Sequence, residues 1–386
     1  MKIRFLLYNV YGQAGGVVTV ALSLAHALAE RHDVEIVTLV RRQTEPANPL
    51  PPGVPVRTLL DYRHDAEPPR TRPWARWASQ RPSRLMPPSA ARYEFNSLYS
   101  DLRLARYVAS VRDGALIGMQ PGVIVAIARL GRASAVRIGQ EHRPFRSRPA
   151  SMRRAALTYY PRLDRLLTLT ERDARHYRRS MDGRVGVMPN GTPPYDGPRS
   201  NQQNKVVIAA GRLRRSKGYD RLIDAWARVV SRHPDWKLRI FGEGPRRNAL
   251  QRQITDRGLG DSVRLMGYSP RLGEEMAEGS LFALSSRAEG YPMVLLEAMA
   301  CGLPVVAFDC RTGPREIITP DRDGVLVPDG DITGFADAIS GLIEQDDRRA
   351  RLGAVALESA RQRSQDAIVD RWEKLLLEEH DRRARR

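Results

Sequence analysis

Cysteine is almost absent from this chain, whose 386 residues include only Cys301 and Cys310. Two thiols without a histidine-rich neighbourhood cannot form a four-ligand zinc site, and so few cysteines exclude a disulfide-stapled scaffold. Free thiols in such small number are typical of a reducing compartment. The sequence therefore predicts a cytoplasmic protein without a structural metal.

Long apolar runs are also missing. A helix needs about 18 or more consecutive apolar residues to span a bilayer, and the best candidate, 115–130, is interrupted by polar residues and a proline. The apolar run that follows Lys2 and Arg4 ends at Asn9, which is too short for the apolar region of a signal peptide. We expect neither a membrane span nor a signal peptide.

Lysine is scarce as well, because arginine supplies most of the 63 basic residues. The net charge is +19, and residues 1–190 hold 31 basic and 15 acidic side chains, a net charge of +16. Residues 191–386 hold 32 and 29, a net charge of +3. A GC-rich genome raises the proportion of arginine but would not concentrate the positive charge in one half of the chain. The asymmetry indicates an anionic partner for the N-terminal half: nucleic acid, an acidic membrane surface or a phosphorylated small molecule.

Apolar residues make up 42% of the chain, which is typical of a globular protein. Short apolar runs alternate with longer amphipathic stretches, a pattern that predicts parallel sheets covered by helices on both faces. One series of predicted strands covers 3–8, 34–40, 115–119, 135–139, 165–169 and 185–188, and a second covers 206–210, 238–241, 263–266, 281–284, 304–307 and 325–327. We expect an α/β protein with two Rossmann-like parallel-sheet domains that face each other across a cleft.

Turn-forming residues predict where these domains meet. The first domain is expected over 1–190, a linker over 191–204 and the second domain over 205–364. An amphipathic helix at about 365–386 could pack back on the first domain.

Residues 42–90 differ from the rest of the first half. Eleven prolines forbid a regular helix through most of this segment, so it is expected to be a long loop. It combines several arginines with Trp74 and Trp77, which suits a membrane interface or an anionic ligand. The alternative is a solvated insertion without a partner.

The first candidate site follows the strand predicted at 206–210. Arg212 and Lys217 lie between this strand and the next helix, where free backbone amides and the helix dipole add to their charge. They are candidate ligands of a diphosphate. In a chain so rich in arginine, a basic loop can equally be ordinary surface.

A second cluster follows the strand predicted at 281–284. Glu289 precedes a helix predicted at 293–301, and Glu297 lies eight residues further on, so both carboxylates can project to one edge and accept hydrogen bonds from sugar or ribose hydroxyls. The free amides near Gly290 and Tyr291 could bind an anion. Alternatively, Glu289 only complements the helix dipole and Glu297 is solvated.

These clusters together resemble the donor-binding domain of glycosyltransferase family 4. The resemblance covers about residues 183–360 and rests on the stretches 211–213 (GRL), 217–218 (KG), 242–245 (GEGP), 267–268 (GY), 289–292 (EGYP) and 296–306 (LEAMACGLPVV). It implies the two-domain GT-B fold and retaining transfer of a sugar, a hexosyl group, from a nucleotide donor.

The same resemblance implies roles for individual residues. Arg212 and Lys217 would hold the diphosphate, Glu297 the ribose hydroxyls and Glu289 the transferred sugar, with the backbone of Gly290, Tyr291 and Pro292 beside it. Such a site orients the donor and stabilises the departing diphosphate electrostatically, so no metal or other cofactor is expected.

An acidic pair in the second half imitates the metal-binding Asp-x-Asp of other glycosyltransferases. Asp329 and Asp331 follow the strand predicted at 325–327 and precede a helix. Asp331 is therefore expected to be an N-cap rather than a metal ligand.

In the first half the resemblance is looser. Gly15 and Gly16 match the glycine turn whose backbone would lie against the donor, although the next residues, 17–19, lack the charged residue often found there. His142 resembles the histidine that family members place beside the reacting sugar. A histidine in a polar loop is otherwise unremarkable.

Two alternatives to a glycosyltransferase remain open from the sequence. The charge of the first half suits a nucleic-acid-binding protein, but recognised nucleic-acid-binding motifs are absent and aromatic residues make up only 6%. The same fold also serves sugar-nucleotide epimerases and phosphorylases.

Under the favoured interpretation the partners are a nucleotide-sugar donor and a glycolipid, cell-envelope glycan or natural-product acceptor. No nucleic acid is expected. The acceptor could be anionic or membrane-bound, with peripheral contact at the inner face of the membrane.

Overall fold

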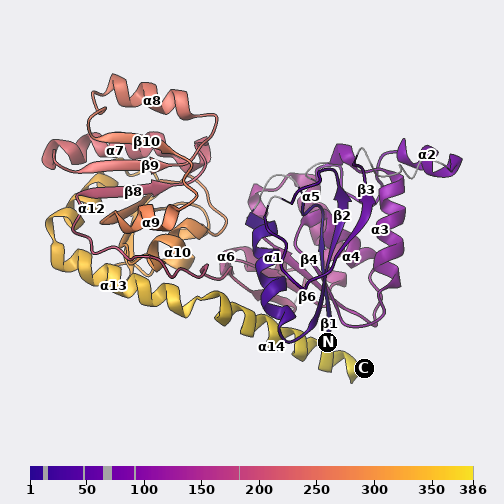
Figure 1. The fold of residues 1–386 in the computed structure, drawn as a ribbon. Coiled ribbons are helices and arrows are strands. Elements are labelled where there is room, and N and C mark those ends of the chain that lie inside the picture. Colours follow the sequence, from indigo (N-terminus) through magenta and orange to yellow (C-terminus); the bar gives the residue numbers. More distant parts are fainter. Residues whose placement is uncertain (12–15, 47, 64–71, 91–92, 182, 386) are drawn as a thin grey trace. The chain divides into compact units, whose positions relative to one another are not determined.

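The computed structural model describes the chain except for residues 12–15, 47, 64–71, 91–92, 182 and 386. The described residues form two compact units (Figure 1). Unit 1 contains Met1–Pro189 together with Ile368–Arg386, and unit 2 contains Asn190–Ala367. Each unit is built on its own parallel sheet, so the predicted pair of Rossmann-like parallel-sheet folds is confirmed.

The sheet of unit 1 has seven parallel strands in the order β3-β2-β1-β4-β5-β6-β7. The strands are β1 (Lys2–Leu7), β2 (Asp33–Arg41), β3 (Val56–Asp61), β4 (Ala115–Gly118), β5 (Val136–Glu141), β6 (Arg165–Thr168) and β7 (Val185–Val187). The helices are α1 (Gly16–Ala29), α2 (Pro73–Ser79), α3 (Leu98–Ser110), α4 (Pro121–Leu130), α5 (Ala150–Tyr159) and α6 (Glu171–Arg178), with 3-10 turns at Tyr93–Phe95, Phe145–Ser147 and Tyr160–Arg162.

Both faces of this sheet are buried. Ile3, Phe5 and Leu7 of β1 belong to one apolar cluster, whereas Leu6 belongs to the cluster on the opposite face. Because side chains alternate along a strand, a strand covered on both faces is apolar at nearly every position. This explains why the apolar runs of the sequence predict the strands of a parallel sheet.

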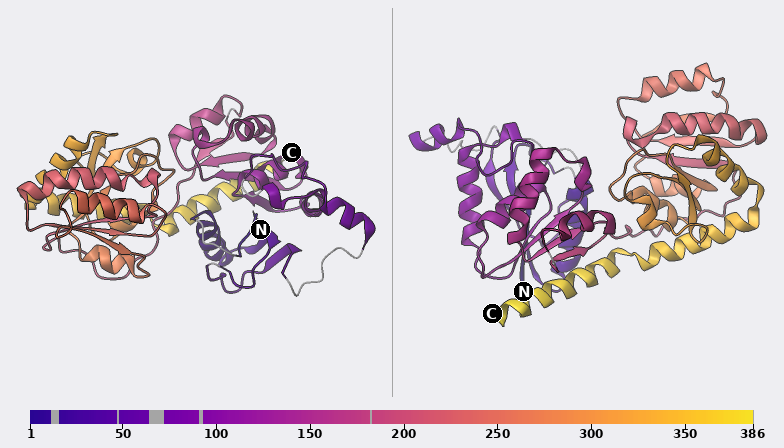
Figure 2. Two further views of the ribbon diagram at one scale, coloured as in Figure 1. Left: turned by 90° about the horizontal axis from the view of Figure 1, so that it is seen from above. Right: turned by 180° about the vertical axis from the view of Figure 1, so that it is seen from behind.

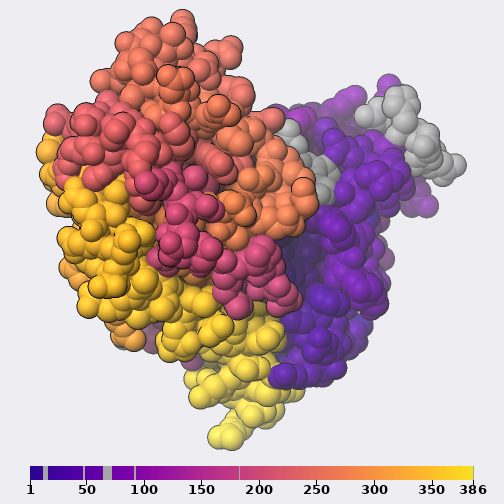
Figure 3. Space-filling model, turned by 60° about the vertical axis from the view of Figure 1, so that its left-hand side comes forward, coloured from indigo at the N-terminus to yellow at the C-terminus, as the bar shows by residue number. Residues whose placement is uncertain are grey.

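The C-terminal helix α14 (Gln365–Ala384) completes one face of unit 1. Its Trp372 and Leu376 are buried in the cluster that contains Ile3 and Phe5. Ion pairs extend the contact, and Arg165 Nε lies 2.5 Å from Glu379 Oε1. The space-filling view shows the yellow end of the chain beside the indigo N-terminal residues (Figure 3).

Unit 2 has six parallel strands in the order β10-β9-β8-β11-β12-β13. The strands are β8 (Val206–Ala210), β9 (Lys237–Phe241), β10 (Val263–Gly267), β11 (Leu281–Leu284), β12 (Val305–Asp309) and β13 (Gly324–Pro328). The helices are α7 (Tyr219–Arg232), α8 (Arg247–Asp256), α9 (Leu272–Ala277), α10 (Met293–Ala300), α11 (Pro314–Ile317), α12 (Ile332–Glu344) and α13 (Asp346–Gln362), with a 3-10 turn at Arg215–Lys217.

The proline-rich segment 42–90 is more regular than the sequence predicts. It contains the edge strand β3 and the short helix α2, whose first residue is Pro73. Proline is tolerated there because the first amide of a helix has no acceptor within it. Asp101 of α3 is buried and accepts hydrogen bonds from Ser83 Oγ (2.6 Å) and from the amides of Arg84 (2.6 Å) and Leu85 (3.0 Å). These bonds tie the end of the segment to unit 1.

None of the helices in the described residues is long and apolar enough to cross a membrane.

Candidate functional site

In unit 2 the candidate residues follow two neighbouring strands. β8 lies next to β11, and the chain continues from β8 to β9 on one side of the sheet and from β11 to β12 on the other. Open parallel sheets bind ligands at the carboxyl ends of strands where the strand order reverses in this way. The loops that follow β8 and β11 therefore lie together at the expected binding edge.

Backbone contacts hold these two loops together. Gly218 has a φ of 65°, and a Cβ at this position would lie 2.1 Å from the carbonyl oxygen of Ser285, so only glycine allows the approach. Ser285 Oγ donates to the carbonyl of Lys217 (3.0 Å), and the amide of Arg287 donates to the carbonyl of Ser216 (2.8 Å). The backbone at Lys217 is thus fixed against the loop that carries Glu289.

An ion pair also strengthens this junction. Arg287 donates two hydrogen bonds of 2.6 Å to the carboxylate of Asp220 in the first turn of α7. Burial alone would raise the pKa of Asp220, but the bonds from Arg287 hold it below its ordinary value. The sequence did not single out Arg287 or Asp220. An acidic residue in the first turn of a helix is common, so Asp220 did not by itself indicate an ion pair with a distant arginine.

The structure brings Lys217 and Glu289 into direct contact. Lys217 Nζ lies 2.7 Å from Glu289 Oε1, which also accepts a hydrogen bond of 2.5 Å from Ser286 Oγ. The backbone carbonyl of Glu289 accepts a further bond of 2.6 Å from Thr312 Oγ1. Because both side-chain bonds end on Oε1, Oε2 is the oxygen that a ligand could use.

Glu297 lies on α10, close enough for its ionisation to respond to Lys217. Burial raises the pKa of Glu297, and the positive charge of Lys217 opposes that shift. One lysine therefore acts on both carboxylates that the sequence singled out. A bound diphosphate would lie beside the same lysine, Lys217.

The residues between the two glutamates lead into α10. Tyr291 is buried, and a Cβ at Gly313 would lie 2.6 Å from Cδ of Pro292 and 3.1 Å from the carbonyl of Gly290. Pro292 precedes the helix without a side-chain cap, and the first turn of α10 carries no acidic residue. The first amides of α10 can therefore bind an anion.

Arg212 is exposed and lies two residues after the end of β8, and Gly242 and Gly244 of the loop after β9 approach the backbone of its two neighbours. A Cβ at Gly242 would lie 2.1 Å from the carbonyl oxygen of Gly211, and the amide of Leu213 donates to the carbonyl of Glu243 (2.8 Å). The conspicuous glycines of the 242–245 stretch therefore have a structural role, because they let this loop support the backbone that carries Arg212.

The acidic pair Asp329 and Asp331 has structural partners. Asp331 caps α12, since its Oδ1 accepts a hydrogen bond of 2.8 Å from the amide of Gly334, so the predicted N-cap is confirmed. Asp329 Oδ1 lies 2.7 Å from Arg221 Nη1. Within the described part of the chain, no group of three or more His, Cys, Asp or Glu side chains is placed to hold a metal ion.

Unit 1 has a pocket of about 320 Å³ at the equivalent edge of its own sheet. Gly16 and His142 both line it, whereas Gly15 lies outside the described residues. Burial lowers the pKa of His142 to about 4, so its imidazole is neutral near pH 7. The neutral ring can donate one hydrogen bond to a ligand and accept another, but it does not contribute a positive charge.

Sequence comparisons relate the chain to proteins of known class. Residues 196–359 match the family described as "Glycosyl transferases group 1". The chain is 36% identical to the exopolysaccharide phosphotransferase SCO2592 of Streptomyces coelicolor over 99% of its own length, but it spans only 41% of that relative. It is 28% identical to the amylovoran biosynthesis glycosyltransferase AmsD of Erwinia amylovora, over 72% of this chain and 82% of AmsD.

Solved structures share the fold of nearly the whole chain. TarM of S. aureus has a TM-score of 0.76 at 15% identity, covering 97% of this chain and 98% of TarM. Anabaena HepE in complex with UDP has a TM-score of 0.75 at 18% identity, covering 98% of this chain and 100% of HepE. These likenesses show that the chain has the GT-B fold, and residues 196–359 of unit 2 are similar to the glycosyl transferases of group 1. They give no support to the nucleic-acid-binding or epimerase and phosphorylase alternatives.

Proposed function

We propose that this protein transfers a sugar from a nucleotide-sugar donor to an acceptor hydroxyl with retention of the anomeric configuration. The observation that carries the proposal is the contact of Lys217 with Glu289 at the N-terminus of α10, with Glu297 nearby. A cation, open helix amides and carboxylates are the groups that a sugar diphosphate needs from its binding site.

Each of these groups has a role in the proposed reaction. Lys217 and Arg212 hold the donor diphosphate and stabilise the charge that develops as it departs, together with the first amides of α10. Glu297 binds the ribose hydroxyls, and Oε2 of Glu289 accepts a hydrogen bond from the sugar. In unit 1, neutral His142 offers a hydrogen bond to the reacting sugar. Because fixed cations and dipoles stabilise the diphosphate, we propose that no metal takes part.

The comparisons suggest which substrates to test first. HepE has been solved with UDP-glucose and TarM with UDP, so uridine donors have priority. SCO2592 and AmsD are named for exopolysaccharide and amylovoran, which supports a cell-envelope glycan or polysaccharide as the acceptor class. The reaction is proposed to take place in the cytoplasm.

Nucleotide sugars are expected to stabilise the protein, and transfer is expected to survive a chelator. Thermal shift against UDP, GDP, dTDP, ADP and their sugars identifies the donor, and transfer to candidate acceptors is then measured with excess EDTA. NMR of the product gives the anomeric configuration. Loss of transfer that Mg²⁺ or Mn²⁺ restores would refute metal independence, and stabilisation by none of the nucleotides would refute the donor site.

We also propose that α2 brings unit 1 to an anionic membrane. Ala75 and Ala78 of this helix are buried, whereas Trp74 and Trp77 are 51% and 54% exposed, which reverses the usual placement of small and large apolar residues. Arginines around the helix are exposed at positions 72, 76, 81 and 84. Figures 1 and 2 show α2 at the periphery of unit 1, beyond α3. Exposed tryptophans flanked by arginines suit the headgroup region of an acidic bilayer.

Binding to acidic liposomes is expected at low salt and is expected to fade as salt rises, because each arginine near the surface contributes about 1 kcal/mol that salt screens. Replacing both Trp74 and Trp77 with serine should weaken sedimentation with these liposomes at least about fivefold. Tyr268→Ser is the matched control, since Tyr268 is 75% exposed in unit 2. Equal binding of the double variant and the wild type would contradict the role of α2.

A further inference from the structure

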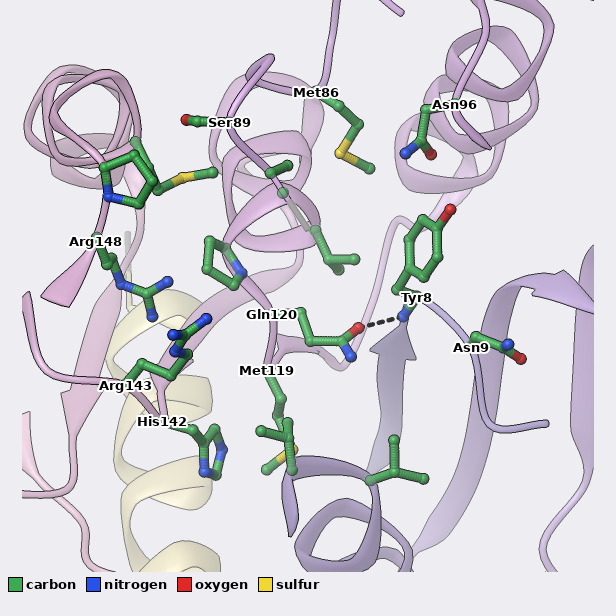
Figure 4. A pocket seen from close by; sticks show the side chains of 18 of the residues that line it. Tyr8, Asn9, Met86, Ser89, Asn96, Met119, Gln120, His142, Arg143 and Arg148 are labelled. Carbon is green, nitrogen blue, oxygen red and sulfur yellow. Dashed lines mark hydrogen bonds between the residues drawn. The ribbon is translucent and has the colours of Figure 1, made fainter. Parts of the chain in front are cut away.

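The pocket of unit 1 lies where three strands of the sheet end. Tyr8 follows β1, Gln120 follows β4 and His142 follows β5, and all three line the pocket. Figure 4 shows Arg143 and Arg148 on the side of the view opposite Tyr8 and Asn9. The pocket therefore combines the usual binding edge of a parallel sheet with two arginines.

Three helices begin at this pocket, and each presents its positive end. Gly16 of α1 and Gly122 of α4 line the pocket, as does Pro149, which precedes α5. None of the three helices has an acidic residue in its first turn. The side chain of Gln120 does not cap α4, because its Oε1 accepts a hydrogen bond of 2.5 Å from the amide of Tyr8 (Figure 4). These helix ends favour an anion.

A buried arginine supplies an observation independent of the helix ends. Arg148 is only 7% exposed and pairs with Glu141, which also accepts a hydrogen bond of 2.6 Å from Tyr160 Oη. Among the described residues, Nε of Arg148 is buried and has no hydrogen-bond partner. A buried donor without an acceptor is costly, so a ligand oxygen would satisfy it.

The remaining charge at the pocket is positive. Glu141 neutralises Arg148, and His142 is neutral, so the exposed Arg143 provides the surplus charge together with the helix ends. The described lining contains no carboxylate. The nearest carboxylate outside the lining is that of Glu141, whose charge is already paired with Arg148.

Another part of the lining is apolar and built from flexible side chains. Met86, Met119 and Met152 line the pocket and are each at most 3% exposed. A Cβ at Gly122 would lie 2.5 Å from Sδ of Met86, so the methionine packs directly on the start of α4. Thioether side chains adapt to apolar ligands of varied shape. The cavity volume of about 320 Å³ lies in the range of small-molecule sites.

We infer that this pocket binds the acceptor through an amphiphilic anionic portion. Its phosphate group lies at Arg143, Arg148 and the starts of α4 and α5, and the adjoining apolar portion lies against the three methionines. The inference rests on the proposed function insofar as the ligand is the acceptor. It narrows the acceptor class to a phosphorylated amphiphile. A neutral oligosaccharide would offer neither an anionic group to the arginines nor an apolar group to the three methionines.

Methionine methyl NMR on the full chain tests this binding without any donor or transfer. The probe is octyl phosphate, and inorganic phosphate and octyl glucoside carry its two halves separately. The methyl signals of Met86, Met119 and Met152, assigned through Met→Leu variants, are expected to shift with octyl phosphate, which should bind at least about fivefold more tightly than either control probe. Binding of octyl glucoside with equal affinity would overturn the anionic half of the inference.

Arg143→Gln tests the charge in the pocket, and Arg154→Gln is the matched control because Arg154 is exposed on α5 and does not line the pocket. We expect Arg143→Gln to weaken octyl phosphate at least about fivefold and to leave octyl glucoside unchanged, while Arg154→Gln changes neither. Equal losses in the two variants would mean that only net charge matters and would overturn the site. UDP titrations made in parallel report the donor site separately, so failure of the proposed function and failure of this inference are distinguishable.

Discussion

Lys217→Ala is expected to weaken use of the nucleotide-sugar donor about 10- to 100-fold. A charge-assisted hydrogen bond is worth about 1.5 to 3 kcal/mol, and the change also removes the partner of Glu289. Without the ammonium of Lys217, the carboxylates of Glu289 and Glu297 would repel the incoming diphosphate. The measurement is kcat/KM for the donor, with the Kd of the free nucleoside diphosphate alongside it.

Lys205→Ala is the matched control for this prediction. Lys205 belongs to the same unit, but its ammonium is exposed and pairs with Asp235 at the surface. The control removes the same charge and should leave donor affinity unchanged, because exposed ion pairs contribute little. Equal affinity of wild type and Lys217→Ala for the nucleoside diphosphate would remove Lys217 from the donor site.

The central strands were predictable because burial on both faces leaves an unmistakable apolar run. β8 and β11 occupy the predicted residues, and most other strands differ by one or two positions at an end. β3 was missed because this edge strand follows several prolines and contains exposed Arg57. α2 was missed for a related reason, since its largest apolar side chains face solvent and hide the usual helical periodicity.

The sequence singled out candidate residues for the site but not the contacts that hold them in place. Lys217, Glu289 and Glu297 could be singled out by residue type, position beside predicted strands and family resemblance. The backbone approach of Gly218 to Ser285 could not, because it depends on how two loops far apart in the sequence meet. The buried pair of Arg148 with Glu141 was equally hidden, since arginine is abundant and burial cannot be read from one residue.

Glu289→Gln is expected to separate transfer from nucleotide binding. The substitution keeps the size of the side chain but removes its charge, so Oε2 no longer offers a carboxylate to the sugar. We expect transfer to fall at least about 100-fold, the effect typical of losing one preorganised electrostatic contact in an active site. The Kd of the free nucleoside diphosphate should stay within about twofold, because that ligand lacks the transferred sugar that Glu289 contacts.

The control for Glu289→Gln is Glu358→Gln, which neutralises an exposed carboxylate of α13 in the same unit. It should change neither transfer nor nucleotide affinity. Lys217→Ala lowers affinity for both the nucleotide and its sugar, whereas Glu289→Gln lowers transfer alone, so the two variants assign the two partners of one ion pair to different parts of the donor. If Glu289→Gln instead weakens the nucleotide as strongly as Lys217→Ala does, Glu289 acts by holding the lysine in place rather than by contacting the sugar.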